Sequence, residues 1–420
     1  MEKFVIEGGR PLKGEVKISG SKNAALPILA ATLLTDQKCV VRSVPKLRDT
    51  LTMCKLLRSL GKIVEIHEDR VTVSPSGPLN YIADYKLVST MRGSFCVLGP
   101  LLAKLGKAKV SLPGGCVIGV RPVDLHMKGL MTLGAKTDFE AGYVTARANR
   151  LKGQQVYLGG VFGSSVLATA NVMMAAALAH GETIIESAAC EPEVEDLGNF
   201  LSAMGAKIQG QGTPRIFING VRKLGGADYR ITSDRIEAGT FVLMAAATRS
   251  EIVLRNAHYS HLLALIDRLE QVGVDVKKDG NLIRVKPRKN LKPVSVTTYP
   301  HPGFPTDLQA QYMALMATVP GVSVITDKVF PDRFMHIAEL NRMGAQIRRE
   351  GGSAIVEGGK TLYGAPVMAS DLRASAALVI AGLAARGKTE ILRIYHLDRG
   401  YENIDRKLTD LGAVVRRARE

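Results

Sequence analysis

The chain has 420 residues, of which 46% are hydrophobic, and this content excludes a disordered or fibrous protein. Only 5% are aromatic and none is tryptophan, which argues against an aromatic platform for single-stranded nucleic acid. Its 56 Lys and Arg against 39 Asp and Glu give a net charge of +17, so at least one anionic partner is expected.

Six segments rich in Ala, Leu and Met are apolar on nearly all faces, which predicts helices buried between other elements. In chain order they are Ala24–Leu34, Arg92–Leu105, Val166–Ala179, Ala238–Ala247, Leu308–Ala317 and Arg373–Ala385. Each is soon followed by a β-branched segment typical of a strand: CVVRSV, KVSLPG, TIIESA, EIVLRN, VSVITD and TEILRI.

A second pattern ends in a glycine and interleaves with the first. The pattern Leu-x-x-ψ-Gly, in which ψ is Leu, Met or Val, recurs in LRSLGKIV, LMTLGAKT, LSAMGAKI, LEQVGVDV, LNRMGAQI and LTDLGAVV. The glycines are Gly61, Gly134, Gly205, Gly273, Gly344 and Gly412, spaced by 73, 71, 68, 71 and 68 residues. Helical spacing before each glycine and alternation after it predict a helix, a glycine just past its end, and then strands.

Six units of about 70 residues therefore make up the chain. Each is predicted to contain a buried helix, a strand, a loop, an amphipathic helix and one or two strands. Three plus three units form an α/β protein of two domains, with a join near Leu224–Arg230. The N-terminal strand is expected to cross back to the second half.

Neither a membrane anchor nor a disulfide framework is expected. The N-terminal segment MEKFVIEGGRPLKG has no signal pattern, and the longest apolar stretches are shorter than the ~20 residues that span a bilayer. Five cysteines, Cys39, Cys54, Cys96, Cys116 and Cys190, lack CxxC spacing and are odd in number. We expect a reduced, cytoplasmic protein without membrane insertion.

Two loops hold residues suited to binding or catalysis. Gly20-Ser21-Lys22-Asn23 precedes the first buried helix, and its backbone N–H groups with Lys22 suit an anion. The alternative for this loop is a simple helix cap with a solvated lysine. Leu112–Pro122 surrounds Cys116 with three glycines and two prolines, and Arg121 would favour its thiolate. We interpret Cys116 as a catalytic thiol, against a spectator role, and the other cysteines as core or neutral residues.

Acidic and basic residues recur in the loops of the second half. They are Thr306-Asp307, Asp332-Arg333, Asp371-Leu372-Arg373 and Asp398-Arg399, to which Arg48 and Arg92 are added from the first half. One such pair is most often a solvated ion pair contributing under ~1 kcal/mol. Their recurrence in successive repeats favours a cleft lined from both halves for a small, multiply charged anion.

These segments also carry a resemblance over essentially the whole chain. The chain resembles the family of UDP-N-acetylglucosamine enolpyruvyl transferases, through GEVKISGSKNAALPILAA, LPGGCVIGVRPVDLH, CEPEVEDL, HPGFPTDLQAQ, VFPDRFMH, ASDLRASAALVIAGL and RIYHLDRGYENI. The resemblance implies two inside-out α/β domains built from six βαβαββ-type repeats. It places residues 1–21 and 230–420 in one domain and inserts residues 22–229, with the Cys116 loop, as the other.

The resemblance also implies a reaction. Enolpyruvyl passes from phosphoenolpyruvate to the 3-hydroxyl of UDP-N-acetylglucosamine, and phosphate leaves through a tetrahedral intermediate. This is the first committed step of peptidoglycan synthesis, and it uses no metal and no cofactor. The implied partners are the two substrates, without nucleic acid, and the oligomeric state stays open, a monomer included.

Roles carry over residue by residue from the same resemblance. Lys22, Arg121 and Arg399 would bind phosphoenolpyruvate. Cys116 would serve as proton donor or in product release, and would be the thiol that fosfomycin alkylates. Asp307 would be the base for the sugar hydroxyl.

Further residues are implied to surround the substrates. The substrate-binding set also contains Asn23, Arg92, Pro122, Val123, Asp124, Leu125, Val329 and Arg373. The residues that support the cleft are Arg48, Glu191, Asp234, Arg333 and Asp371. Two positions depart from the family: Arg48 stands where Lys is frequent, and Gly160–Ser165 replaces the usual diphosphate loop.

Two alternatives remain open on the sequence alone. The nearest is the related enolpyruvyl transferase that acts on a shikimate phosphate, although that enzyme lacks the loop around Cys116. The other is a basic nucleic-acid-binding repeat protein, against which the few aromatics and the dispersed arginines argue.

Overall fold

The structure is a computed structural model that describes residues 2–114 and 123–419. Contacts divide these residues into two compact units, each with its own hydrophobic core. The terminal unit comprises residues 2–19 and 233–419, and the inserted unit comprises residues 20–114 and 123–232.

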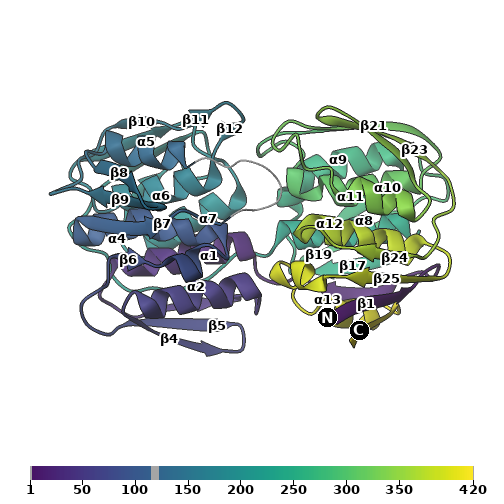
Figure 1. Ribbon diagram of the computed structural model, residues 1–420, viewed down its shortest axis with the longest axis horizontal. Helices are drawn as coiled ribbons and strands as arrows, with labels where there is room; N and C mark the ends of the chain where they lie inside the picture. The colour runs from purple at the N-terminus through teal and green to yellow at the C-terminus, as the bar shows by residue number, and fades with distance from the viewer. Residues whose placement is uncertain (1, 115–122, 420) are drawn as a thin grey trace. The chain divides into compact units, whose positions relative to one another are not determined.

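Three central helices fill the interior of the inserted unit: α1 (Lys22–Ala31), α4 (Leu98–Leu105) and α6 (Val166–Ala176) (Figure 1). Three further helices, α2 (Arg48–Ser59), α5 (Asp124–Thr132) and α7 (Pro192–Ala203), follow one in each repeat. All side chains from Ala24 to Ala31 are buried, because helices apolar on every face must be enclosed.

Sheets of four strands cover these helices. Their orders are β16-β3-β5-β4, β6-β7-β9-β8 and β10-β13-β15-β14. The strands are β3 (Cys39–Arg42), β4 (Lys62–His67), β5 (Arg70–Pro75), β6 (Ile82–Ala83), β7 (Lys107–Ser111), β8 (Lys136–Glu140), β9 (Tyr143–Arg147), β10 (Gln155–Tyr157), β13 (Glu182–Glu186), β14 (Lys207–Gln209), β15 (Arg215–Asn219) and β16 (Asp228–Arg230). The smaller elements are α3 (Tyr85–Val88) and the hairpin of β11 (Gly159–Gly160) and β12 (Gly163–Ser164).

The terminal unit repeats this plan. Its central helices are α8 (Arg235–Ala247), α10 (Gln309–Ala317) and α12 (Leu372–Ala384), and its others are α9 (Leu263–Val272), α11 (His336–Arg342) and α13 (Ile404–Asp410). The sheet orders are β18-β19-β17-β2, β20-β21-β23-β22 and β24-β25-β1-β26. The strands are β1 (Glu2–Glu7), β2 (Lys13–Lys17), β17 (Glu251–Arg255), β18 (Val274–Asp279), β19 (Leu282–Pro287), β20 (Val296–Thr298), β21 (Gly321–Asp327), β22 (Gln346–Glu350), β23 (Ser353–Gly358), β24 (Pro366–Met368), β25 (Lys388–Leu392) and β26 (Val414–Arg419).

Strands distant in sequence close both units. In the terminal unit, β1 pairs with β25 and β26, so the predicted return of the N-terminal strand is confirmed. In the inserted unit, β16 near its end pairs in parallel with β3 near its start. Each unit is therefore held by backbone hydrogen bonds between its first and last segments.

The repeat glycines adopt the predicted conformation. All six have φ between 87° and 101°, a region that residues with a Cβ atom rarely enter. Nothing lies within 4 Å of a Cβ built on Gly134 or Gly412, so their requirement is conformational and not spatial. The prediction of a glycine just beyond each amphipathic helix is confirmed.

Several predicted helix bounds need correction. The segment Arg92–Leu105 is not one α-helix, because Arg92–Val97 forms the 3-10 segment η2 before α4. Pro100 explains the change, since its ring would meet the carbonyl of residue 96 in a continuous α-helix. Helix α6 ends at Ala176, and α1 continues as the 3-10 turn η1 (Thr32–Leu34).

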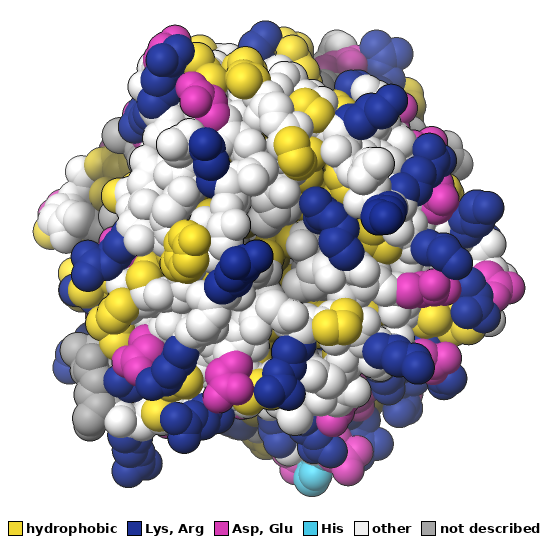
Figure 2. Space-filling view, turned by 90° about the vertical axis from the view of Figure 1, so that its right-hand side faces the viewer, with side chains coloured by type: hydrophobic (Ala, Val, Ile, Leu, Met, Phe, Trp, Pro, Cys, Tyr) yellow, Lys and Arg dark blue, Asp and Glu magenta, His cyan; other side chains and the backbone are white. Residues whose placement is uncertain are grey.

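Surface charge is mixed on the face drawn in Figure 2. Lys and Arg side chains are spread over it, with Asp and Glu beside many of them. Within the described residues, no helix is both long and apolar enough to cross a membrane. No group of three or more His, Cys, Asp or Glu in that part of the chain is arranged to hold a metal ion.

Candidate functional site

Seven of the candidate residues lie where a central helix or the 3-10 segment before it begins. In four repeats the side chain of the N-cap residue, just before the central helix, accepts one or two backbone N–H groups of that helix. These N-cap residues are Ser21, Ser165, Asp234 and Asp371. The other two central helices are preceded by 3-10 segments, η2 and η4 (Thr306–Leu308), which carry Arg92 and Asp307. The residues that precede these two segments make no side-chain cap.

Asp307 is held by two arginines of the terminal unit. Arg333 Nη1 donates to Oδ1 at 2.7 Å, and Arg373 Nη2 donates to Oδ2 at 3.0 Å. The arginine side chains are 4% and 3% exposed, whereas the carboxylate is 29% exposed. Burial opposes ionisation, but the charges of Arg373 and Arg333 outweigh it and hold the pKa of Asp307 well below its usual range. Asp307 is therefore ionised and partly accessible.

Several polar side chains near Asp307 form hydrogen bonds that hold Arg373 in place. Arg373 Nη1 donates to Tyr401 Oη at 3.1 Å, and that oxygen lies 2.9 Å from Thr240 Oγ1. Gln311 Nε2 donates to Tyr401 Oη at 3.2 Å and to the carbonyl of Asp307 at 2.8 Å. The sequence patterns did not predict this group, although Gln311 is a polar residue inside an apolar helix.

The loop after β21 is ordered by Asp327. Its Oδ1 accepts the backbone N–H of Val329 at 3.0 Å, and its Oδ2 accepts the hydroxyl of Thr306 at 2.7 Å. Because the Val329 N–H is used internally, a ligand contact there would have to involve its carbonyl or side chain. Arg333 Nη1 also donates to Thr306 Oγ1 at 3.3 Å, which links this loop to Asp307.

Two of the predicted supporting acids, Asp234 and Asp371, act as helix caps. Asp371 Oδ1 accepts the backbone N–H groups of Arg373 at 2.8 Å and Ala374 at 3.2 Å, and so anchors the residue that binds Asp307. His336 lies in the same region. Burial lowers its pKa to about 4, opposed by Asp371 and reinforced by Arg333, so His336 is neutral at pH 7.

In the inserted unit, Lys22 is paired. Its Nζ lies 3.1 Å from Asp49 Oδ2, and the two side chains are only 11% and 5% exposed. Ser21 Oγ accepts the N–H of Ala24 at 3.3 Å, so the helix cap expected for this loop is present. The alternative prediction that Lys22 is solvated is wrong, because Asp49 holds Lys22 in a partly enclosed position.

A buried amide connects the helices near Arg92. Asn171 Oδ1 accepts the N–H of Gly99 at 2.8 Å, and its Nδ2 donates to the carbonyl of Phe95 at 3.0 Å. The same Nδ2 lies 2.8 Å from His126 Nδ1, which must accept and so leaves the ring proton on Nε2. Burial and the charge of Arg92 lower the pKa of His126 to about 3.

The remaining predicted residues within the described part of the chain lie at the ends of helices. Arg48 is exposed at the start of α2, and Asn23 and Arg399 are half-buried in α1 and the 3-10 segment η5 (Ile394–Arg399). Val123 is buried before α5, Asp124 and Leu125 begin that helix, and Glu191 precedes α7. Cys116, Arg121 and Pro122 lie outside the described residues.

The other cysteines are core or neutral residues, as predicted. Cys39, Cys54 and Cys96 are buried, and Cys190 is partly buried. Burial raises the pKa of Cys54 to about 11 and that of Cys96 to about 12, so these thiols stay protonated near pH 7.

Comparison with known proteins identifies the chain as an enolpyruvyl transferase. A sequence profile described as EPSP synthase (3-phosphoshikimate 1-carboxyvinyltransferase) matches residues 6–408, and the chain belongs to this family. Solved structures agree on the fold: the enolpyruvyl transferase NikO from Streptomyces tendae has a TM-score of 0.89 at 24% identity, with 99% of each chain covered. EPSP synthase from Acinetobacter baumannii has a TM-score of 0.76 at 19% identity, with both chains fully covered. The predicted fold is confirmed.

Relatives with higher sequence identity are named for a more specific activity. A UDP-N-acetylglucosamine 1-carboxyvinyltransferase from Methylacidiphilum infernorum is 51% identical over 99% of both chains. One from Carboxydothermus hydrogenoformans, numbered 2, is 54% identical over 99% of both, and one from Lawsonia intracellularis is 53% identical over the whole of both.

Proposed function

We propose that this chain transfers enolpyruvyl from phosphoenolpyruvate to the 3-hydroxyl of UDP-N-acetylglucosamine. The observation that carries this is full-length identity of 51% to 54% with relatives named for that activity. The 3-oxygen bonds to C2 of the donor, the C2–oxygen bond to phosphate breaks, and the hydroxyl proton and phosphate leave. The methylene carbon gains a proton on addition and loses one on elimination, so the step balances.

Asp307 is the proposed base for the sugar hydroxyl. Its ionised, partly exposed carboxylate supports this role, because a base must be deprotonated and within reach of the proton. A carboxylate of low pKa is a weak base, but protonation of the methylene makes C2 cationic. Attack on that centre acidifies the hydroxyl, so a weak base suffices.

Cations hold the donor in this proposal. Lys22 and Arg399, with Arg121, bind the phosphate and carboxylate of phosphoenolpyruvate, to which ammonium and guanidinium groups are suited. The pairing of Lys22 with Asp49 supports its part, since it holds the ammonium in one position before the donor arrives. The acceptor side comprises Arg92, Asn23, Val123, Asp124, Leu125 and Val329. The residues that support this side are Glu191, Arg48, Asp234, Arg333 and Asp371.

The wider setting follows from the reaction. The transfer is the first committed step of peptidoglycan synthesis in the cytoplasm, and so contributes to cell shape and division. Cys116 acts as the loop thiol and is the site of fosfomycin alkylation. Labelling should disappear in Cys116→Ala, and labelling that persists in that variant would assign the reactive thiol to another cysteine.

Phosphate release tests the proposal directly. Purified protein with phosphoenolpyruvate should release phosphate when UDP-N-acetylglucosamine is added, and not when shikimate 3-phosphate is added. Release only with shikimate 3-phosphate would establish the other acceptor, and no release with either would overturn the assignment. Asp307→Ala should lower turnover at least ~10²-fold. Asp332→Ala, which removes an exposed carboxylate, is the matched control.

A further inference from the structure

The outer face of the sheet β6-β7-β9-β8 carries a row of cations. In the strand register, Lys107 lies opposite Arg147, and Arg147 lies opposite Lys136 on its other side. All three side chains are exposed, while Ala108 and Ala146, the next residues along, are buried. Like charges directly opposite each other, with Cβ atoms ~4.5–5.5 Å apart, destabilise a sheet. The three cations of this row therefore repel one another.

Each of the other four-stranded sheets neutralises at least one of its outward cations. Among the described residues, each of these five sheets has at least one ion pair on its strands, represented by Arg42–Asp228, Arg215–Glu186, Arg284–Asp279, Arg348–Glu350 and Lys3–Glu390. Throughout the same described part of the chain, no carboxylate lies within 4.0 Å of Lys107, Lys109, Lys136 or Arg147. Their counter-charge is thus missing from the described protein itself.

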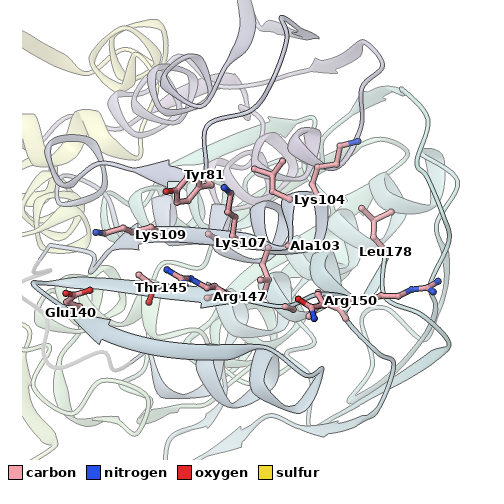
Figure 3. A pocket seen from close by; sticks show the side chains of 18 residues that line it. Tyr81, Ala103, Lys104, Lys107, Lys109, Glu140, Thr145, Arg147, Arg150 and Leu178 are labelled. Carbon is pink, nitrogen blue, oxygen red and sulfur yellow. The ribbon is translucent and has the colours of Figure 1, made fainter.

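Lys107, Lys109 and Arg147 line an open groove of about 870 Å³ on the inserted unit (Figure 3). Lys107, Lys109 and Arg147 project from neighbouring strands, and Arg150 stands toward the far end. Lys104 also lines the groove but is paired with Asp36 at 2.6 Å. Glu140 is the single carboxylate among the lining residues and lies opposite Tyr143 in the register.

Aromatic rings hold two of the ammonium groups in place. Lys107 Nζ lies 4.3 Å from the centroid of the Tyr81 ring, and Lys109 Nζ lies 5.1 Å from that of Tyr143. Tyr143 is itself fixed, because its hydroxyl donates to Asp84 Oδ1 at 3.1 Å. Such contacts stabilise a cation by ~0.5–1 kcal/mol at an exposed site and restrict its motion. The groove therefore presents positioned charges and not freely moving lysine tails.

We propose that this groove is a binding site for a small oligophosphate, separate from the residues proposed for catalysis. Lys107 and Lys109 are two residues apart on one strand, ~6.6–7 Å, and Arg147 is on the next, ~4.8 Å away. Two or three linked phosphate groups cover that span, and a guanidinium fork beside two ammoniums suits their oxygens. A groove of this volume accommodates a small ligand, whereas a lipid surface needs a flat or convex face.

Calorimetric titration of the full chain with inorganic tripolyphosphate at ~0.15 M salt, where long-range attraction is screened, tests this site. The variant Lys107→Gln/Arg147→Gln should weaken binding at least tenfold. Lys277→Gln/Lys278→Gln, which removes two exposed lysines of β18, is the charge-matched control and should stay within twofold. Lys22→Gln should also leave binding unchanged, since it removes a cation of the proposed donor site.

Three results would overturn the proposal. Equal weakening in both double variants would mean that tripolyphosphate responds only to net charge. Loss in Lys22→Gln would place the ligand at the donor site. Tighter binding of hexa-aspartate or phosphatidylglycerol vesicles, lost in Lys107→Gln/Arg147→Gln, would identify a different class of partner. Should that variant fail to fold, Arg147→Gln alone carries the test, with an expected weakening of at least threefold.

Discussion

Removing Asp307 should destabilise the terminal unit, because two buried guanidinium groups would lose their carboxylate. An opposite charge at ~4 Å contributes about 4 kcal/mol of attraction at an effective dielectric constant of about 20. Asp307 makes two such contacts, at 2.7 and 3.0 Å between heavy atoms, with arginines that are 4% and 3% exposed. Desolvation offsets much of this attraction, and breaking a buried pair costs ~3–5 kcal/mol.

We expect Asp307→Ala to lower the free energy of unfolding by about 3 kcal/mol, at the low end because the carboxylate is partly exposed. For a domain of this size the midpoint of thermal unfolding would fall by roughly 6–12 °C. Urea and thermal unfolding followed by circular dichroism measure both quantities. Asp332→Ala breaks the exposed pair with Arg349, 2.8 Å apart, and should cost under ~1 kcal/mol.

The pH dependence separates this electrostatic effect from lost packing. Folding lowers the pKa of Asp307, so its stabilisation is present above the unfolded pKa of ~3.9. It is lost as the pH falls through the still lower folded pKa. The difference between wild type and Asp307→Ala should therefore be constant from about pH 8 to 5 and shrink below about pH 4. A loss no greater than that of Asp332→Ala, or one independent of pH down to about 2, would refute the reasoning.

Three further predictions concern buried or constrained positions. Burial raises the pKa of Asp196 to about 6, so the folded state binds its proton more tightly than the unfolded state does. The free energy of unfolding should therefore fall as the pH rises from about 4 to 6. Asp196→Asn should remove up to ~3 kcal/mol of this fall, measured by urea unfolding across that pH range, and an unchanged pH dependence would contradict the prediction. Asn171→Leu should cost ~2–4 kcal/mol by leaving the Gly99 N–H without its partner, and a neutral effect would show that the helices repack. Gly134→Ala, at φ 95°, should cost ~1–2 kcal/mol through backbone strain alone, because no atom obstructs the new methyl group, and an unchanged unfolding midpoint would disprove this.

Part of the candidate site could be predicted from sequence because it repeats. Asp234 and Asp371 occupy equivalent helix entries, and their recurrence at matching points of two repeats is visible in the sequence itself. Asn171 and Gln311 left a weaker signal, as polar residues inside apolar helices. Tyr401 left none, because its role depends on the hydroxyl and guanidinium groups that meet its oxygen only in the folded unit.

Local physics explains what the sequence by itself determined: six repeats, their buried helices and the glycines that end the amphipathic helices. Helix periodicity and a positive φ involve residues within one or two turns, so the residues themselves record them. Tertiary structure alone decided that Asp307 meets Arg333 and Arg373 and that Lys22 meets Asp49. It also decided that, within the described part of the chain, one sheet places Lys107 opposite Arg147 with no carboxylate in ion-pair range. Those contacts join residues 26 to 66 positions apart, and their distances follow from how whole repeats pack. The charge of +17 shows the same division, since composition supplies its amount while the fold sets which cations are neutralised.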